Sequence, residues 1–214
     1  MSIKAVIFDW DGTVVDSVEH IADCLLHAAV STGYPELERA AYRDIIGLGI
    51  MEALRRLYPG MNAEDTVRMR EAYSTHFMAT SASNQRIFPG MTEILQDLHA
   101  TDRRCAVATG KSRRGLNAAL ESSQLAHWFH ITRCADETRS KPDPRMLIEI
   151  LEHFELEPAD AVMIGDTSYD LQMAQAIGMP SIGVRWGVHG DEVLSLFKPA
   201  AIVGNTTELA SLLR

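Results

Sequence analysis

Apolar residues follow two different patterns along the chain, and the change between them is abrupt. Residues 3–8 form a short, largely apolar run with β-branched side chains, which predicts a strand buried on both faces. Over residues 16–83, apolar positions recur at helical spacing, as at Val18, Ile21 and Leu25. Glycine and proline residues divide this stretch into about four expected helices, with no convincing strand between them.

After residue 83, short apolar runs alternate with helical periods. The expected strands cover residues 105–108, 130–134, 161–164, 181–184 and 201–203; the expected helices cover residues 90–100, 112–122, 143–154, 169–177, 192–197 and a last segment from about 208. Such alternation is typical of a parallel sheet covered on both faces. We therefore predict an α/β fold with a doubly wound, Rossmann-like parallel sheet, formed by residues 1–15 and 84–214. Residues 16–83 are expected to be an inserted all-helical cap domain.

Composition and charge limit the classes of partner. The 214 residues can bury about 70% of the surface of the unfolded chain, which allows one core and a small second lobe. A formal net charge of -9 provides no basic surface for nucleic acid. No apolar run reaches transmembrane length, and the apolar run before Asp9 is too short for a signal peptide. We expect a cytoplasmic protein that binds neither nucleic acid nor membranes, and the pattern indicates no particular oligomeric state.

The three cysteines Cys24, Cys105 and Cys134 occur singly, in apolar or helical surroundings. Isolated cysteines of this kind predict buried free thiols in a reducing compartment. His20 and His27 flank Cys24 at helical spacing, but two ligands on one helix do not make a metal site, so we expect a structural role for them.

Aspartates follow the first strand directly. Asp9 comes after four apolar residues, where a carboxylate is costly unless it is paired or bound to a metal. Asp11, followed by a glycine, is on its own typical of a turn. Because ligands bind outside the carboxyl ends of strands in open parallel sheets, polar residues at these ends are the candidate site.

Three further stretches meet this criterion. Thr109 and Gly110 follow the strand expected at 105–108, Lys141 follows that at 130–134, and Asp166 and Asp170 follow that at 161–164. The alternative role of the last two aspartates is capping of the following helix.

Convergence of the four carboxylates would require a cation. Two unit charges about 4 Å apart repel by roughly 4 kcal/mol at an effective dielectric of about 20, and four carboxylates form several such pairs. Carboxylate oxygens without histidine or thiolate ligands suit Mg²⁺. With the charge of Lys141, the hydroxyl of Thr109 and the accessible backbone of Gly110, the set describes a phosphate site in which a carboxylate is the nucleophile.

Four motifs in these stretches, DWDGTVVD, ATG, SKPDP and GDTSYD, closely resemble those of the haloacid dehalogenase (HAD) superfamily, in order and with a helical insertion after the first. The resemblance covers essentially the whole chain. The insertion point and the stretches IIGLGIMEAL and GVRWG look like phosphoglycolate phosphatase-type members.

The resemblance implies a role for each matching residue. Asp9 matches the nucleophile that forms an aspartyl-phosphate, and Asp11 matches the acid that protonates the leaving oxygen and then activates water. Thr109 and Gly110 match the phosphate-binding segment. Lys141 matches a residue that binds phosphate and also steadies the nucleophile.

The resemblance also implies a Mg²⁺ site. Asp9, the carbonyl of Asp11 and Asp166 match the metal ligands. Asp170 matches a residue that ligates through water or holds Lys141.

The acid two residues after Asp9 favours phosphoryl transfer over C–halogen cleavage, because the dehalogenases of this superfamily lack it. We therefore expect a Mg²⁺-dependent phosphatase that acts on a small phosphate ester and is similar to phosphoglycolate phosphatase. The alternatives are a β-phosphoglucomutase-like phosphotransferase and a non-catalytic regulatory protein that retains the fold.

Residues near the cap loop Gly47–Gly49 are hypotheses for substrate selection, because the loop reaches the active site in proteins that this chain resembles. They are Leu48 and Arg43, followed by Arg55 and Arg56. Three other basic residues, Lys111, Arg113 and Arg114, open a helix beside the phosphate-binding segment. Their place in the sequence would allow contact with the substrate, but we expect them to be solvated, as charged side chains usually are. Trp186 is compatible either with core packing or with a place in the site.

Overall fold

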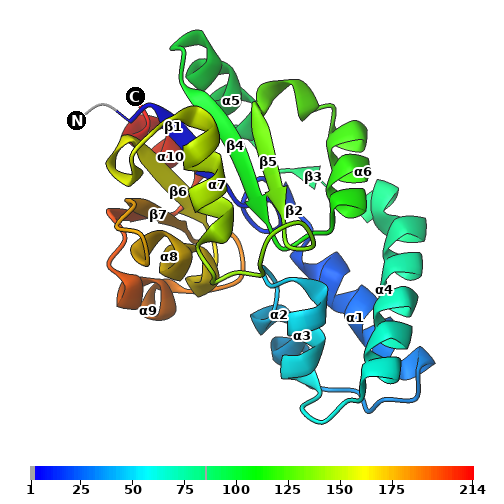
Figure 1. Cartoon of the computed structure of the whole chain (residues 1–214). Helices are drawn as coiled ribbons and strands as arrows, with labels where there is room; N and C mark the ends of the chain where they lie inside the picture. Colours follow the sequence, from blue (N-terminus) through cyan, green and yellow to red (C-terminus); the bar gives the residue numbers. More distant parts are fainter. Residues whose placement is uncertain (1–2, 85) are drawn as a thin grey trace.

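The computed structural model describes residues 3–84 and 86–214, and within them a parallel sheet lies between two layers of helices (Figure 1). The sheet has six strands in the order β5-β4-β1-β6-β7-β8, and every neighbouring pair is parallel. The strands are β1 (Ala5–Phe8), β4 (Arg104–Thr109), β5 (Ile131–Cys134), β6 (Ala161–Gly165), β7 (Ser181–Val184) and β8 (Ala201–Val203). The doubly wound α/β fold predicted from the alternation of apolar runs is confirmed.

Side chains of β1 alternate between two apolar cores, one on each face of the sheet. Val6 and Phe8 pack in a cluster with residues of α5, α6 and α10, whereas Ala5 and Ile7 pack in a cluster with residues of α7 and α8. This two-sided burial is why β1 has no polar residue before Asp9. The helices of the sheet domain are α5 (Met91–Ala100), α6 (Arg113–Ser123), α7 (Arg145–Phe154), α8 (Ser168–Gln175), α9 (Asp191–Leu194) and α10 (Thr206–Leu212).

Short 3₁₀ helices complete the core. They are η1 (Ala126–Trp128), η2 (Pro158–Asp160) and η3 (Ser195–Phe197). The helix expected at 192–197 is therefore two short elements, α9 and η3. The helix expected from residue 143 begins at Arg145, because Asp143 lies in the turn before it and its side chain accepts a hydrogen bond from the Arg145 amide.

A lobe of four helices, within the described residues, lies beside the carboxyl end of the sheet, where β4 and β5 point (Figure 1). The helices are α1 (Val18–Ser31), α2 (Arg39–Asp44), α3 (Ile50–Leu57) and α4 (Ala63–Asn84). They bury an apolar cluster of their own, which includes Leu25, Leu54 and Met69 and is joined by Tyr169 of the core helix α8. The domain boundaries at 15/16 and 83/84 stay a prediction, and residues 1, 2 and 85 of the predicted core lie outside the described residues.

Two short strands connect the lobe to the sheet domain. β2 (Val15–Asp16) pairs antiparallel with β3 (Arg86–Ile87). The chain therefore leaves the core and returns to it at one place. The sequence pattern did not indicate these strands, because two residues are too few to show a period.

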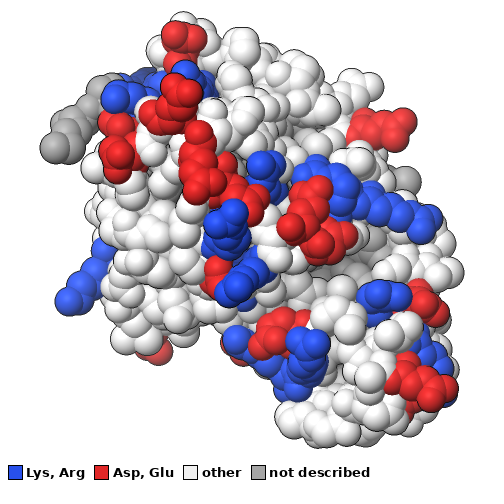
Figure 2. All heavy atoms as spheres, viewed as in Figure 1, with Lys and Arg blue, Asp and Glu red and all other residues white. Residues whose placement is uncertain are grey.

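The charged side chains are mixed on the face in view (Figure 2), and the three cysteines are buried. Figure 2 shows Lys and Arg side chains next to Asp and Glu over the face in view, without one broad basic area. Cys24, Cys105 and Cys134 are buried and free, as predicted. Across residues 3–84 and 86–214, none of the helices has the length and apolar character that crossing a membrane requires.

Candidate active site

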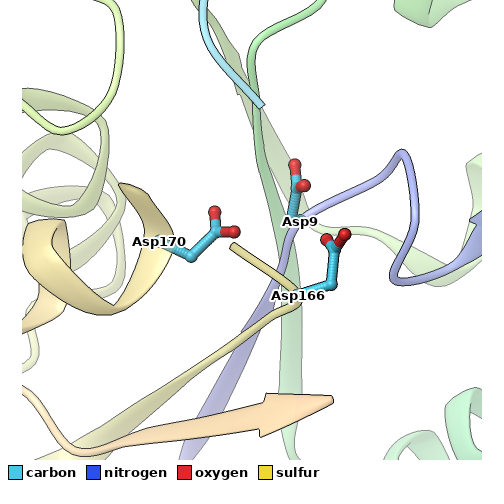
Figure 3. A group of neighbouring side chains, drawn as sticks. All are labelled: Asp9, Asp166 and Asp170. Carbon is cyan, nitrogen blue, oxygen red and sulfur yellow. The ribbon is translucent and has the colours of Figure 1, made fainter. Parts of the chain in front are cut away.

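Three carboxylates meet at the carboxyl edge of the sheet. Asp9 follows β1, Asp166 follows the neighbouring strand β6, and Asp170 lies in the first turn of α8. Phe8, the last residue of β1, pairs with Ile164, and β6 ends one residue later at Gly165, so the two strands deliver their aspartates at neighbouring places. Figure 3 shows the three side chains around one point, and one oxygen from each lies within 4.8 Å of the others.

Lys141 lies between two of these carboxylates. Its Nζ is 2.6 Å from Asp9 Oδ1 and 2.5 Å from Asp170 Oδ1, and its side chain is 0% exposed. Burial by itself lowers the pKa of the lysine, but the charges of Asp170 and Asp9 outweigh it and raise the pKa above its ordinary value. Lys141 is therefore a fixed positive charge that holds both carboxylates in place.

Two of the carboxylates, Asp9 and Asp166, are destabilised in their ionised form by the protein. Burial raises the pKa of Asp9 well above its usual value, although Lys141 opposes the shift. Burial, together with the charge of Asp170, raises the pKa of Asp166 to about 7. A divalent cation among these groups would favour the ionised form of each of them.

The donor set fits such a cation. Lys141 uses Oδ1 of Asp9, whereas Oδ2 of Asp9 is buried without a hydrogen-bond partner in the described part of the chain. A buried oxygen of this kind is costly unless a ligand completes it. Carboxylate oxygens with no nitrogen or sulfur donor in the group are the ligands that Mg²⁺ prefers.

The position of Asp166 is set by its own hydrogen bonds. Thr13 Oγ1 donates to Oδ1 at 2.9 Å, and the amide of Val188 donates to Oδ2 at 2.9 Å. Two glycines make room for it: a Cβ on Gly12 would lie 2.3 Å from Oδ2, and one on Gly187 would lie 2.1 Å from it. Gly12 also has φ +79°, so glycine is required there both for the turn and for the approach of Asp166.

Helix capping belongs to Asp170 and not to Asp166. Asp170 Oδ2 accepts hydrogen bonds from the hydroxyl of Thr167 at 2.7 Å and from its amide at 3.2 Å, which forms a capping box at the start of α8. Because Oδ1 bonds to Lys141, Asp170 anchors the lysine to the helix. Of the two roles expected for Asp170, this geometry favours holding Lys141.

Asp11 lies apart from the three-carboxylate group. Its Oδ1 accepts a hydrogen bond from Ser17 Oγ at 2.6 Å and lies 3.0 Å from Lys111 Nζ. The side chain of Lys111 is only 7% exposed, so the expectation that it is solvated is wrong. The charge of Lys111 is balanced by Asp11, which is about a hundred residues away in the sequence and is brought close only by the fold. Arg113 is half-buried against Glu137.

The phosphate-binding segment predicted after β4 lies beneath the cap loop. Thr109 is fully buried, and its Oγ1 accepts a hydrogen bond from the amide of Lys111 at 3.2 Å. A Cβ on Gly110 would lie 2.5 Å from the carbonyl oxygens of both Gly47 and Leu48. The loop is thus in direct contact with the segment, and the side chain of Leu48 is buried.

The remaining predicted residues lie around the lobe. Arg43 forms an ion pair with Glu19 at the exposed surface, and Arg55 pairs with Glu52. Arg56 reaches the core instead, where its guanidinium donates to the hydroxyl of Tyr169.

Trp186 packs against the core, and its indole nitrogen donates to the carbonyl of Thr13 at 3.1 Å. It thus fixes the same turn that supplies a hydrogen bond to Asp166.

Sequence reasoning did not single out several residues of the site. Thr13 and Ser17 bind carboxylates of the site, and Ser140 accepts a hydrogen bond from the Gly49 amide at 2.8 Å. Thr13 and Ser140 stand inside the recognised motifs, so their position was a usable signal. Ser17, and the pairing of Lys111 with Asp11, became visible only through the fold.

Comparisons with known proteins support one family. A family model described as haloacid dehalogenase-like hydrolase matches residues 6–184. The relative named "Probable phosphatase IndB", from Dickeya dadantii, is 33% identical over 95% of this chain and 90% of its own length. A phosphoglycolate phosphatase from Vibrio cholerae is 30% identical over 92% of this chain and 91% of its own.

Solved structures agree on the fold. A haloacid dehalogenase-like family hydrolase from Streptococcus pneumoniae has a TM-score of 0.86 at 20% identity and covers 99% of both chains. A hydrolase from Pseudomonas syringae has a TM-score of 0.90 at 21% identity, and the match covers 98% of this chain and 97% of that one.

Proposed function

The chain belongs to the haloacid dehalogenase-like hydrolase family, and on that premise we propose that it is a Mg²⁺-dependent phosphatase acting through an aspartyl-phosphate intermediate. The observation that carries the proposal is the environment of Asp9. One of its oxygens is held by Lys141, and the other is buried and without a hydrogen-bond partner in the described residues. Such an oxygen is placed to meet a ligand, either phosphorus or a metal ion.

In the proposed reaction, Asp9 attacks the phosphorus of a phosphate monoester. The bond from phosphorus to the leaving oxygen breaks as the Asp9–phosphorus bond forms, and Asp11 gives its proton to that oxygen. Asp11 then takes a proton from a water molecule that attacks the aspartyl-phosphate, which releases inorganic phosphate and restores Asp9. Lys141 supports the first step because it stabilises the ionised nucleophile.

The rest of the site would bind and shield the phosphoryl group. The Thr109 hydroxyl and the backbone at Gly110 are proposed to bind phosphoryl oxygens. Asp9, Asp166 and the Asp11 carbonyl would hold Mg²⁺, with Asp170 behind Lys141. When bound, Mg²⁺ supplies positive charge that neutralises the phosphoryl oxygens.

The cap lobe supports a small substrate. The catalytic side chains are less than a tenth exposed beneath the loop that contains Leu48, so bulk water is excluded and space is limited. Relatives named phosphoglycolate phosphatase, at 30% and 31% identity, support a substrate similar to phosphoglycolate. The buried free thiols suit a reducing compartment, and we place the enzyme in the cytoplasm.

Hydrolysis of p-nitrophenyl phosphate tests the proposal. Asp9→Asn should abolish turnover, and EDTA should do the same to the native enzyme until Mg²⁺ is added back. The control is Asp160→Asn, which removes a half-buried carboxylate paired with Lys4 before the start of β6 and should leave the rate unchanged. Turnover by Asp9→Asn near the native rate would contradict the nucleophile, and turnover in EDTA would contradict the metal.

A further inference from the structure

Lys111 is a buried cation that has no task in the proposed phosphoryl transfer. Its Nζ lies 3.0 Å from Asp11 Oδ1 and 4.5 Å from the centre of the Phe77 ring of α4. The residue belongs to the core, directly after the phosphate-binding segment, but it contacts the cap. It therefore lies where the two parts of the protein face each other across the site.

The leaving group of the substrate must come close to this lysine. In the proposed function, on which this inference rests, Asp11 protonates the leaving oxygen and so lies within about 3 Å of it. Lys111 Nζ is 3.0 Å from the same carboxylate. Atoms one or two bonds beyond the leaving oxygen are then within reach of the lysine ammonium.

The Lys111 ammonium can also donate hydrogen bonds beyond the contacts described. A lysine carries three N–H groups, and the structure gives Lys111 one ion pair and one ring contact. Lys141 differs, since it is held tightly by Asp9 and Asp170 on the phosphoryl side. The two lysines thus face opposite ends of a phosphate monoester.

Charge on the leaving-group side favours an anion. His20 lies near Lys111, and burial together with the charge of that lysine lowers the pKa of the imidazole, so His20 is neutral at neutral pH. Lys111 supplies the positive charge there, under the ring of Phe77, which excludes water. A carboxylate entering a site that already holds four aspartates would be repelled unless a cation such as Lys111 met it.

We propose that Lys111 is a specificity-determining residue that binds a carboxylate on the leaving group, one carbon away from the ester oxygen. The preferred substrates are then phosphate monoesters of small α-hydroxy acids. Asp11 and Lys111 act on neighbouring atoms of one leaving group, the first on the ester oxygen and the second on the acid.

The test compares two esters of the same shape, phosphoglycolate and its neutral amide, 2-phosphoglycolamide. The measured quantity is the ratio of their kcat/KM values, in which any shared effect on Asp11 cancels. The native enzyme should prefer the acid, and Lys111→Met should lower the ratio by roughly tenfold to hundredfold, as expected for a hydrogen bond between charged groups. Arg114→Met, which removes an exposed cation from α6, the helix that follows Lys111, should leave the ratio unchanged.

A binding measurement makes the test independent of turnover. 3-Phosphonopropionate, a non-hydrolysable analogue of phosphoglycolate, and its amide are titrated into each variant by calorimetry in Mg²⁺ buffer. The native protein should bind the acid more tightly by a similar factor, and Lys111→Met should not.

The outcomes separate the two proposals. An equal ratio for both esters in the native enzyme, or a ratio unaltered by Lys111→Met while both rates fall, would overturn the role of Lys111 and leave the phosphatase intact. If neither these esters nor p-nitrophenyl phosphate is hydrolysed, the proposed function fails, and calorimetry still decides whether the protein selects the acid. Should Lys111→Met fail to fold, the preference of the native protein between the two analogues remains decisive.

Discussion

Replacing Asp166 by Asn should change how the stability of the protein depends on pH. The carboxylate is fully buried beside Asp170, and burial and this neighbouring charge raise its pKa to about 7. Two hydrogen bonds and the space left by two glycines keep it in this unfavourable place. Asparagine has nearly the same shape but cannot ionise, so it removes the titration and retains most of the packing.

The magnitude follows from the shift. Its folded pKa of about 7 is raised from an ordinary value of 3.8, and roughly three pKa units correspond to about 4 kcal/mol. Since the folded pKa is raised, the stabilisation from the protonated group is complete below pH 4 and is lost as the pH rises through 7. The raised pKa of Asp9 acts in the same direction.

Urea unfolding in EDTA at pH 5 and pH 8 measures the effect. In Asp166→Asn the amide oxygen can still accept from the Val188 amide and the amide nitrogen can donate to Thr13 Oγ1, so the effect of the substitution on these contacts is the same at both pH values. The informative quantity is therefore the change in unfolding free energy between the two pH values. We expect the native protein to lose about 3 kcal/mol more than Asp166→Asn over this interval, because roughly two of the three pKa units lie above pH 5.

A matched control and Mg²⁺ complete the experiment. Asp160→Asn alters a half-buried carboxylate whose pKa is lowered by a hydrogen bond from Lys4. Because it titrates below this pH interval, its loss should not flatten the pH profile. Saturating Mg²⁺ at pH 8 should raise the unfolding free energy of the native protein far more than that of Asp166→Asn. Identical pH profiles for the native protein and Asp166→Asn would refute the reasoning that burial makes this carboxylate costly.

Two other substitutions probe the contacts that close the site. Gly110→Ala should lower kcat/KM at least about tenfold in steady-state assays. The added Cβ would lie 2.5 Å from two carbonyl oxygens of the cap loop and would displace this loop. A variant with native kcat/KM would contradict the contact. Lys141→Met should lower the unfolding free energy in EDTA by about 3–5 kcal/mol, since it leaves two carboxylates buried without their cation. Denaturant titration measures that loss, and a change below about 1 kcal/mol would show that the carboxylates are not held by this lysine.

The sheet and the order of its elements were predictable because the central strands β1, β4, β6 and β7 are buried on both faces. A short apolar run such as that of β1 is typical of a strand buried on both faces, and alternation of such runs with helical periodicity indicates a parallel sheet. β2 and β3 were not predictable, because their pairing joins residues far apart in the chain and involves only two residues on each side.

The residues of the site also fall into those that could be placed from the sequence and those that could not. Asp9, Asp166 and Lys141 could be placed from the sequence because parallel strands bring their carboxyl ends to one edge, and the structure brings these residues together. The burial of Lys111 could not be foreseen, since it depends on Phe77, a residue of a different helix, and on the direction in which Asp11 turns. Side-chain direction and contacts between the lobe and the core are properties of the fold.

The pairing of β2 with β3 has a consequence for how such a protein can diversify. Val15 faces Ile87 and Asp16 faces Arg86, so the two ends of the helical lobe are neighbours. A gene rearrangement that replaces everything between them would exchange the walls around the leaving group and preserve the order of the strands. Lys111 stands outside that exchangeable segment, so a newly acquired lobe would meet the same lysine, paired with Asp11, on the side where we propose that the leaving group binds.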